Sequence, residues 1–376
     1  MKPDPSAAQS EQKTPRIAFF SDSLAERNGT GAYYFDLLES LSRCRAQVLI
    51  KIFQPLRDVR LNYLSIPMPG DPSQRLITPN LFRIRKGLKA LNPDTVVIVT
   101  PGPFGLVGYL YARKHKLRCI TAFHTNFEQL TKIYWNPINR SMANLYLRSV
   151  NQLLCQNSDS TLIHNSSLVA VIEALGAKNH HLMGTPLPQY FIEKPIVPAP
   201  PTVKQICYAG RLAPEKNIDY IIKAAAHFPE IKFCIIGEGP LKNSLVQQAR
   251  PLKNVQFMSW LNREELVNII DLSNALILPS KIETFGSVAY EAMARGRPVI
   301  VSKDSGIVQW EHLRQTLIIL QRPEDLSQAI HQLADMHSEE RTRVSDQSHR
   351  AARDFHEQTL NQWVDLLSSK NRVGKR

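Results

Sequence analysis

The chain predicts an α/β fold built from two doubly wound parallel sheets, and three observations support that prediction. Its 376 residues suffice for two domains of about 100–200 residues each. Short apolar runs rich in β-branched residues alternate with helix-length segments, which is the pattern of parallel strands covered on both faces. The pattern stops at a Pro-rich stretch, 186–201, and then starts again. We therefore expect two α/β halves that face each other across a cleft.

The apolar runs predict the individual strands, since short β-branched runs bounded by polar residues are typical of buried parallel strands. The first half should contain five, each followed by a possible crossover helix, at residues 16–20, 47–53, 95–99, 118–123 and 160–164. The second half should contain six, at residues 205–209, 232–236, 255–258, 275–278, 298–302 and 316–319. Residues 325–369 have helical periodicity and few helix breakers.

We expect the chain to divide into five segments. The polar residues 1–15 carry no targeting pattern and should form a disordered lead. Residues 16–190 and 205–355 should be the two domains, joined by a Pro-rich linker at 191–204, because proline stiffens the chain and removes amide donors. A C-terminal helix with a basic tail should occupy residues 356–376.

The formal net charge of +13 is concentrated in the first half. Residues 1–195 hold 23 Lys and Arg against 13 Asp and Glu, whereas residues 196–376 hold 23 against 20. Within residues 81–148, only Asp94 and Glu128 oppose the basic residues Arg83, Arg85, Lys86, Lys89, Arg113, Lys114, Lys116, Arg118, Lys132, Arg140 and Arg148. An anionic partner is therefore expected on the first half.

Aromatic residues are interleaved with these charges, namely Phe82, Phe104, Tyr109, Tyr111, Tyr134, Trp135 and Tyr146. A membrane surface fits this mixture, since basic side chains bind anionic headgroups and aromatic rings insert at the acyl boundary. An ordinary solvated basic face fits it equally well. Nucleic acid fits least, because no recognition fold accompanies the charge.

Cysteine usage and hydropathy indicate the compartment. The five cysteines are odd in number and never form Cys-x-x-Cys, which indicates buried thiols in a reducing cytosol. The longest uncharged run, 95–112, approaches membrane-spanning length but contains Pro101, Gly102 and Pro103. A strand, a turn and a helix start explain this run better.

The stretch LPSKIETFGSVAYEAMARGRPV at residues 278–299 carries the most chemistry. A strand should end near Leu278, and a helix should begin around 284–287, with Gly286 allowing close backbone approach. The first-turn amides and the helix dipole favour phosphate. Glu283 before the helix and Glu291 about two turns further on can each accept hydrogen bonds from vicinal hydroxyls. A sugar on each side of a diphosphate would suit these two carboxylates.

The pattern P-S-x-x-E-x-F-G-x-x-x-x-E-A-M-A-x-G-x-P-V in this stretch resembles the retaining nucleotide-sugar glycosyltransferases of family 4. The resemblance implies the α/β GT-B fold, in which two doubly wound Rossmann-like domains face each other across a cleft. It also implies that Glu283 contacts sugar hydroxyls and that Glu291 holds the ribose. The other donor-binding residues of this stretch would be Thr284, Phe285, Gly286 and Ser287. The alternative is that both glutamates are solvated charges on a helix.

A second block, YAGRLAPEKNID at residues 208–219, resembles the G-R-L-x-x-x-K segment of the same family. The resemblance places Gly210 at the donor. It places Arg211 and Lys216 on the diphosphate, where a planar fork of donors and a compact ammonium neutralise the leaving group. No metal would then be needed, and the sequence contains no Asp-x-Asp and no metal-spaced His or Cys cluster. Alternatively, both residues pair with surface carboxylates.

Two glycine turns also match the family. In IIGEGP at 235–240, a structural turn explains Gly237 and Gly239 better than a ligand contact, although Gly237 could pass close to the nucleotide. In NGTG at 28–31, Gly29 and Gly31 would approach the donor diphosphate from the first domain. The third glycine and the later acidic residue of a dinucleotide fingerprint are missing, which disfavours a dehydrogenase.

The segment AFHTNFE at 122–128 resembles family members that glycosylate lipids, such as diacylglycerol glucosyltransferases and sulfolipid synthases. In this setting His124, at a strand end, would hydrogen-bond or polarise the donor sugar, although a lone histidine is usually structural.

Two positions depart from the family pattern. Gly184-Thr185-Pro186 stands where relatives have Gly-Val-Asp, which puts a role for that loop in doubt, and Ile307 stands where a second glycine is usual.

The sequence therefore predicts a metal-independent, retaining hexosyltransferase. It would take a UDP- or GDP-sugar as co-substrate, with no other cofactor and no nucleic-acid partner. Its first domain would supply the acceptor, a lipid hydroxyl at the cytoplasmic face of an anionic membrane. A soluble or polysaccharide acceptor is the first alternative, and a non-catalytic binding protein with the same fold is the second.

Overall fold

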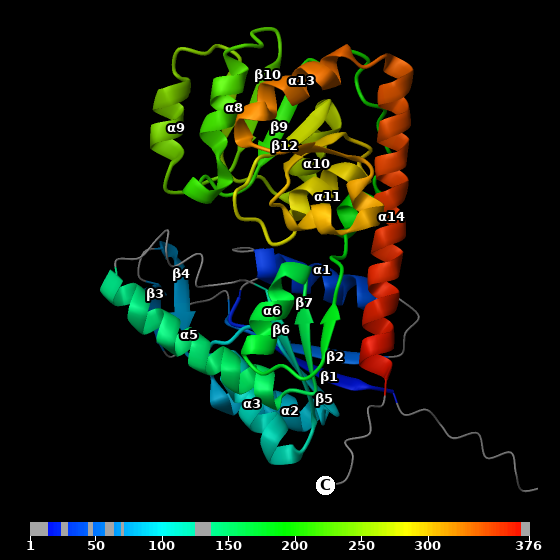
Figure 1. Ribbon diagram of the computed structural model, residues 1–376. Helices are drawn as coiled ribbons and strands as arrows, with labels where there is room; N and C mark the ends of the chain where they lie inside the picture. The colour runs from blue at the N-terminus through cyan, green and yellow to red at the C-terminus, as the bar shows by residue number, and fades with distance from the viewer. Residues whose placement is uncertain are drawn as a thin grey trace, which may run out of the picture.

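The computed structural model describes residues 14–23, 29–43, 48–56, 64–68, 71–124 and 137–369. These residues form two α/β units, drawn one above the other in Figure 1, each with a six-stranded parallel sheet flanked by helices. The predicted α/β class with two doubly wound sheets is confirmed. Of the expected lead and basic tail, residues 1–13 and 370–376 lie outside the described residues.

The sheet of the first unit has the strand order β2-β1-β5-β6-β7-β8. Its strands are β1 (Arg16–Phe20), β2 (Leu49–Phe53), β5 (Thr95–Ile98), β6 (Arg118–Phe123), β7 (Ser160–Ile163) and β8 (His180–Leu182). The helices are α1 (Gly29–Arg43), α2 (Leu81–Leu91), α3 (Pro103–His115), α5 (Pro137–Asn157) and α6 (Val169–Ala174).

Three strands of this unit were not predicted. β3 (Ser65–Met68) and β4 (Asp71–Ile77) form a small antiparallel sheet. Each contains a proline, and a proline within a segment argues against predicting a strand there. The third, β8, is three residues long and exposed throughout, so it carries no apolar run.

The sheet of the second unit has the order β11-β10-β9-β12-β13-β14. Its strands are β9 (Gln205–Ala209), β10 (Lys232–Ile236), β11 (Val255–Met258), β12 (Ala275–Leu278), β13 (Val299–Ser302) and β14 (Leu317–Leu320). The helices are α8 (Ile218–Ala225), α9 (Lys242–Ala249), α10 (Arg263–Leu272), α11 (Ser287–Ala294), α12 (Glu311–Arg314) and α13 (Leu326–Asp335).

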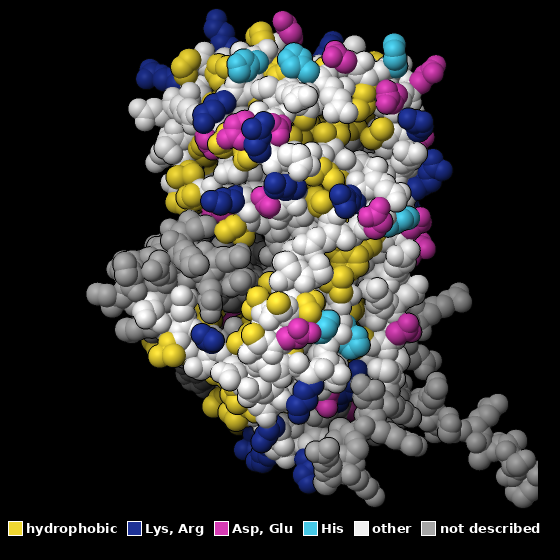
Figure 2. Space-filling model, viewed as in Figure 1, with side chains coloured by type: hydrophobic (Ala, Val, Ile, Leu, Met, Phe, Trp, Pro, Cys, Tyr) yellow, Lys and Arg dark blue, Asp and Glu magenta, His cyan; other side chains and the backbone are white. Residues whose placement is uncertain are grey.

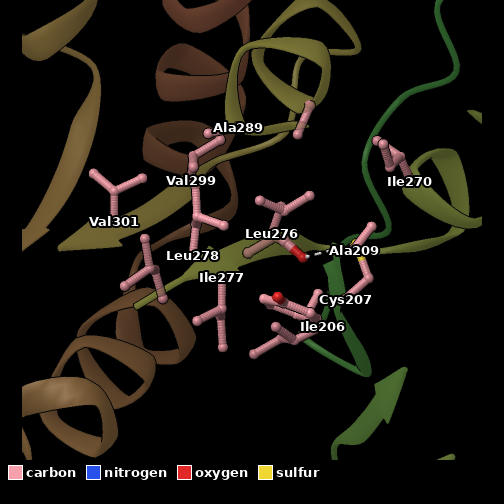
Figure 3. Packing of buried hydrophobic residues seen from close by; sticks show 14 of the residues in the cluster. Ile206, Cys207, Ala209, Ile270, Leu276, Ile277, Leu278, Ala289, Val299 and Val301 are labelled. Carbon is pink, nitrogen blue, oxygen red and sulfur yellow. Dashed lines mark hydrogen bonds between the residues drawn. The ribbon is translucent and has the colours of Figure 1, made fainter. Parts of the chain in front are cut away.

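The core of the second unit explains why its strands are predictable. Ile206, Leu276, Ile277 and Val299 are at most 1% exposed, and Figure 3 shows them among the side chains packed around β9, β12 and β13. Because a parallel strand of this kind is covered on both faces, its sequence is a continuous apolar run. Burial of each large side chain stabilises the fold by about 1.5–3 kcal/mol.

Two segments connect the units. The linker, with α7 (Gln189–Glu193), leads from the first unit to the second, and α14 (Ser338–Ser368) runs alongside both (Figure 1). Phe355 of α14 packs in the core of the second unit, whereas Trp363 and Leu367 pack in that of the first. The helical segment expected over 325–369 is interrupted, because Met336 and His337 adopt extended backbone between α13 and α14.

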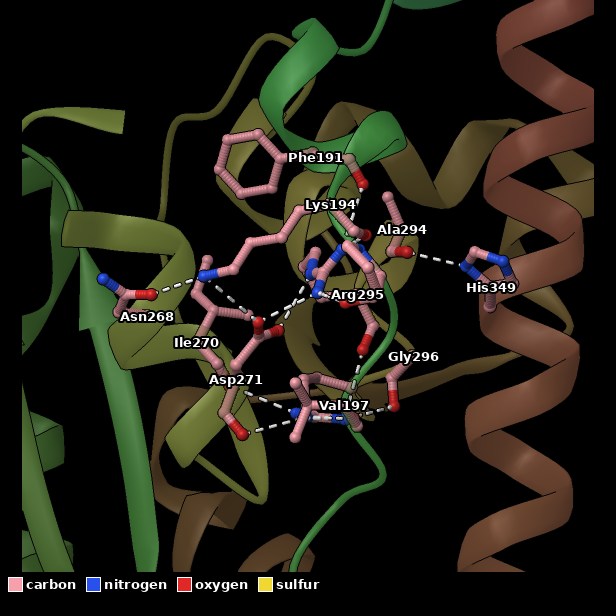
Figure 4. A network of polar contacts seen from close by, with 12 residues as sticks. Phe191, Lys194, Val197, Asn268, Ile270, Asp271, Ala294, Arg295, Gly296 and His349 are labelled. Atoms are coloured by element: carbon pink, nitrogen blue, oxygen red, sulfur yellow. Dashed lines mark hydrogen bonds and ion pairs between the residues drawn. The ribbon is translucent and has the colours of Figure 1, made fainter. Parts of the chain in front are cut away.

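Two buried arginines fix the linker to the second unit, and Figure 4 labels one of them, Arg295, beside Lys194 and Asp271. Arg295 and Arg297 are at most 1% exposed. Arg295 donates to the two carboxylate oxygens of Asp271 at 2.8 and 2.9 Å, and Arg297 donates to the Asp271 carbonyl at 2.7 Å. The two guanidinium groups also donate to linker carbonyls, among them those of Lys194, Pro195 and Val197. The linker is therefore held by buried charge as well as by its prolines.

The cysteines and helices bear on the compartment predicted from sequence. Cys119, Cys155, Cys207 and Cys234 are buried free thiols, as expected, and Cys44 lies outside the described residues. Within the described ranges, no helix combines the length and the apolar character needed to cross a membrane.

Candidate active site

Glycine turns bring together the loops that follow β9 and β10. The amide of Gly210 donates to the Ile236 carbonyl at 3.0 Å, and the amide of Leu212 donates to the Glu238 carbonyl at 2.8 Å. A Cβ atom on Gly237 would lie 1.9 Å from the Gly210 carbonyl oxygen, and Gly237 has a φ of +144°. Only glycine fits where these loops touch, so the turn accounts for Gly237 without a ligand.

The loop after β12 joins them and completes a charge pair. The Asn217 side-chain amide donates to the Pro279 carbonyl at 3.0 Å, which ties the β12 loop to the β9 loop. Lys216 Nζ lies 2.6 Å from Glu283 Oε2, and their side chains are 16% and 18% exposed. The sequence assigned these residues to different parts of a donor, whereas here each neutralises the other. A bound diphosphate would compete with Glu283 for Lys216.

Helix α11 starts at this loop, as the sequence predicted. Gly286 precedes the helix with a φ of +97°, a conformation that favours glycine. The side chain of Phe285 is buried against Tyr290 and Phe355, with ring centroids 5.6 and 6.0 Å apart. Phe285 can therefore offer a ligand little beyond its backbone, whereas the side chain of Ser287 is exposed at the helix start.

The segment after β13 braces the Glu283 loop. The amide of Gly306 donates to the Glu283 carbonyl at 2.9 Å, and the amide of Ile307 donates to the Phe285 carbonyl at 2.7 Å. A Cβ atom on Gly306 would lie 1.8 Å from the Thr284 carbonyl oxygen. Ile307, which departs from the family pattern, is fully buried in the core. These contacts hold the loop backbone in place and leave the Thr284 side chain half-buried.

Arg211 lies in the β9 loop directly after Gly210, and its carbonyl accepts from the Tyr208 hydroxyl at 3.0 Å. Its side chain is half-buried. The structure thus brings Arg211, Lys216 and Glu283 to one edge of the second sheet, as the motifs predicted.

Glu291 of α11 lies near an ion pair that links the two units. Arg263 at the start of α10 donates from Nη2 to Oδ2 of Asp36 in α1 at 2.6 Å. Burial raises the pKa of Glu291 to about 8, opposed by the charge of Arg263 and assisted by that of Asp36. Burial also raises the pKa of Asp36 to about 6, opposed by its contacts with Arg263. At neutral pH the Glu291 carboxyl is therefore mainly protonated, so it can both donate and accept a hydrogen bond.

The units also touch on a second side. The amide and hydroxyl of Ser166 donate to Oε1 of Gln309 at 2.8 and 2.6 Å. A Cβ atom on Gly306 would lie 3.1 Å from the Asn165 side-chain nitrogen, so the first unit reaches the segment that braces Glu283. Sequence reasoning missed Asp36, Arg263, Ser166 and Gln309, because their pairing depends on how the units dock and leaves no local pattern.

His124 directly follows β6 in the first unit. Its Nε2 lies 3.0 Å from the Tyr34 hydroxyl, and its ring stacks on His164 with centroids 4.6 Å apart and planes 16° apart. Burial, and then the neighbouring His164, hold the pKa of His124 well below its ordinary value. The imidazole is therefore neutral at physiological pH.

Gly29 and Gly31 of the first unit lie in a helix, whereas we expected them in the loop before it. Gly29 and Gly31 lie in the first turn of α1 rather than in a loop before it, because the helix already begins at Gly29. Asn28, which precedes them, lies outside the described residues.

The basic segment 81–148 is only partly a surface. Arg118 is 8% exposed, and its guanidinium donates to the carbonyls of Leu366 and Ser369 at 2.7 and 2.9 Å. Phe104 and Tyr109 are also buried. Including these three residues in an exposed basic and aromatic surface was wrong, because sequence gives charge and not burial.

Other residues of the first unit do reach the surface. Exposed large apolar side chains include Leu81, Phe82, Leu110, Leu145 and Tyr146. In the face drawn in Figure 2, the lower end of the first unit carries several Lys and Arg side chains, whereas the second unit mixes basic and acidic ones. Lys132, Tyr134 and Trp135 lie outside the described residues.

Comparison with known proteins places this arrangement in a family. An uncharacterised glycosyltransferase of Methanocaldococcus jannaschii is 34% identical over 112 residues, 28% of this chain and 29% of that protein. The chain thus matches under a third of that relative's length. A GDP-mannose-dependent α-(1-6)-phosphatidylinositol dimannoside mannosyltransferase of Mycobacterium tuberculosis is 23% identical over 76% of this chain and 77% of its own.

A solved structure shares the fold. The crystal structure of Anabaena HepE in complex with UDP and glucose superimposes with a TM-score of 0.67 at 15% sequence identity, covering 94% of this chain and 100% of that one. Family models match both units: Glycosyltransferase Family 4 over residues 27–182 and Glycosyl transferases group 1 over residues 191–350. With its two parallel sheets and the loops that meet at their edges, the chain belongs to the family-4 glycosyltransferases and has the GT-B fold.

Proposed function

We propose that the protein is a retaining glycosyltransferase that moves a hexose from a UDP- or GDP-sugar to an acceptor hydroxyl. The observation that supports this most is the pairing of Lys216 with Glu283 in the loop before α11, with Arg211 in the adjoining β9 loop, because cationic groups and helix amides there can hold a diphosphate. Glu283 would accept from sugar hydroxyls, and Glu291 would bind the ribose. The mannosyltransferase and the UDP-bound protein among the similar proteins are consistent with this donor class.

In this mechanism the acceptor oxygen attacks the anomeric carbon from the side of the leaving group. The bond from the anomeric carbon to the diphosphate oxygen breaks, the bond to the acceptor oxygen forms, and the acceptor proton passes to the departing phosphate. Arg211 and Lys216 stabilise the negative charge that develops on the diphosphate. No side chain acts as a nucleophile, so catalysis depends on charge stabilisation and on positioning.

Lys216 would exchange partners during this cycle. Without donor, its ammonium pairs with Glu283 at 2.6 Å. When a diphosphate arrives, the ammonium turns to the phosphate oxygens and Glu283 is released to accept from the sugar. The charges of Arg211 and Lys216 remove the need for a metal ion, so chelation with EDTA should leave turnover unchanged.

The acceptor in this proposal is a lipid hydroxyl at the cytoplasmic face of an anionic membrane, to which the enzyme binds peripherally. The basic charge of the first half, with Phe82, Leu145 and Tyr146 exposed, favours such a surface. A soluble or polysaccharide acceptor is the alternative, and a non-catalytic protein is a further one that the intact set of Arg211, Lys216 and Glu283 argues against.

The test is mass spectrometry of anionic liposomes containing diacylglycerol after incubation with the protein and a panel of UDP- and GDP-sugars. A lipid heavier by one hexose would support the sugar-nucleotide donor, the lipid acceptor and the transferase activity together. Transfer only to added soluble sugars or polysaccharide would contradict the lipid acceptor and keep the transferase. Unmodified lipid, unmodified soluble acceptors and intact donors would contradict the enzyme assignment.

A further inference from the structure

Two histidines occupy matching positions at the carboxyl edge of the first sheet. β6 and β7 pair in parallel with Phe123 opposite Ile163, so His124 and His164 follow at equivalent points. Their rings stack with centroids 4.6 Å apart and planes 16° apart. The family resemblance of the sequence covers His124 and not His164, which therefore needs its own explanation.

His164 is held in one orientation. Its Nδ1 lies 2.7 Å from the Met183 carbonyl oxygen, which can only accept, so Nδ1 carries the proton. The ring is 3% exposed, and its Nε2 has no hydrogen-bond partner within the described part of the chain. A buried acceptor without a partner destabilises a fold by about 1–3 kcal/mol. Stability alone would favour an apolar side chain at position 164. We therefore infer that the imidazole ring of His164 serves a purpose other than stability.

Tyr34 fixes an edge of the His124 ring. Its hydroxyl lies 3.0 Å from His124 Nε2, and the two rings meet edge to face with centroids 5.3 Å apart. Tyr34 is 1% exposed, and burial keeps its hydroxyl protonated by raising its pKa. Within the described part of the chain, this hydroxyl hydrogen-bonds to His124 Nε2. When the hydroxyl donates to Nε2, the proton of the neutral His124 ring lies on Nδ1.

We propose that Tyr34 and His164 are positioning residues that present His124 to the donor sugar as a neutral imidazole with its proton on Nδ1. His164 supports one face of the ring, and Tyr34 fixes its tautomer from one edge. The opposite edge is then a single N–H donor for a sugar hydroxyl oxygen. The inference rests on the proposed function, because it assigns a sugar-recognition role within the same site.

Three variants separate these contributions. Tyr34→Phe removes only the hydroxyl, His164→Asn keeps a donor for the Met183 carbonyl but removes the flat ring, and His164→Phe keeps a flat ring without nitrogens. His181→Asn is the matched control, because His181 lies on β8 at the edge of the same sheet and its Nε2 lies 3.3 Å from the Ser160 hydroxyl.

The readouts are the affinity for free UDP or GDP, and kcat and KM for the sugar nucleotide. Tyr34→Phe and His164→Asn should lower kcat/KM about 10-fold, the equivalent of one hydrogen bond, while free-nucleotide affinity stays unchanged. His164→Phe should recover most of the loss, and His181→Asn should resemble the wild type. Equal losses for Asn and Phe at position 164, or a parallel loss of free-nucleotide affinity, would overturn the positioning role.

A spectroscopic measurement tests the tautomer without any ligand. Nitrogen-15 NMR of histidine-labelled protein should show His124 neutral with its proton on Nδ1 at pH 7, and Tyr34→Phe should redistribute that proton. A proton on Nε2 in the wild type would overturn the inference. If the wild type binds no sugar nucleotide at all, the proposed function fails and takes the inference with it. Normal wild-type activity with unaffected variants overturns the inference alone.

Discussion

At the scale of single residues, the close pairing of Lys216 with Glu283 is the feature that most affects chemistry. The two opposite charges lie 2.6 Å apart, and both side chains are mostly buried. The ion pair therefore fixes the position of both side chains before a donor binds. A substitution of either residue leaves the other without its counter-charge. We therefore expect a variant of this pair to change sugar-nucleotide binding and kcat to different extents.

Lys216→Ala should lower kcat by about 100-fold or more, because the departing diphosphate loses a charge that matters most in the transition state. The KM for the sugar nucleotide should change much less. Steady-state kinetics checks this, with Lys223→Ala as control, because Lys223 is an exposed lysine of α8 paired with Asp219. Unchanged kcat would show that Lys216 does not face the leaving group.

Glu291 makes stability depend on pH. Its pKa is raised from an ordinary 4.5 to about 8, so between these values the folded chain binds more protons than the unfolded chain. The stabilisation that Glu291 gives the folded chain is complete below about pH 4.5 and is lost as pH rises through about 8. The free energy of unfolding of the wild type, relative to Glu291→Gln, should therefore fall from pH 5 to pH 8.

Urea unfolding at several pH values measures this difference. Glu357→Gln, at an exposed position on α14, is the control and should show no such trend. A flat difference between the wild type and Glu291→Gln would mean that Glu291 is ionised in the folded protein.

The sequence located these residues but not their partners. Motif spacing put Arg211, Lys216, Glu283 and Glu291 on the loops and the helix where they lie. The ion pair of Lys216 with Glu283 and the approach of Asp36 to Glu291 depend on tertiary contacts, which no local pattern reveals.

At the scale of elements, buried strands were predictable because continuous apolar runs end where burial ends. β1, β6, β9, β10, β11 and β12 have the predicted bounds. The exposed β8 and the proline-containing β3 and β4 lack that signal. The break between α13 and α14 was missed, since neither Met336 nor His337 is a helix breaker by composition.

Arg295 gives the linker a test at this scale. Arg295→Met would leave the Asp271 carboxylate and two linker carbonyls without their main donor, and losing one partner of a buried ion pair costs about 3–5 kcal/mol. Chemical denaturation should show that loss of stability, whereas Arg314→Met, on the exposed side of α12, should change it little. Equal stability of the two variants would mean that the prolines alone hold the linker.

At the scale of the whole molecule, α14 and the linker join two units that also touch through Asp36–Arg263 and Ser166–Gln309. That α14 packs against both cores was not predictable, because helical periodicity does not say which core a helix will meet. The domain bounds 16–190 and 205–355 stay a prediction.

The two contacts should favour the closed arrangement of the units. The double variant Asp36→Ala/Gln309→Ala should have a larger radius of gyration by small-angle X-ray scattering than the wild type. Glu39→Ala/Gln315→Ala also removes one acidic residue and one glutamine, with Glu39 paired within α1 and Gln315 bonded to Glu311, and is the control. Identical scattering from all three proteins would show that α14 and the linker set the arrangement alone.

The central claim is that the Arg211, Lys216 and Glu283 loops bind a sugar nucleotide and break its sugar–phosphate bond. Phosphorus-31 NMR of UDP- and GDP-sugars with the protein and a mixture of lipid and soluble acceptors follows that bond directly. The account predicts that free UDP or GDP appears with the wild type and is almost absent with Lys216→Ala. Intact donors with the wild type throughout the panel, or equal release by both proteins, would contradict it.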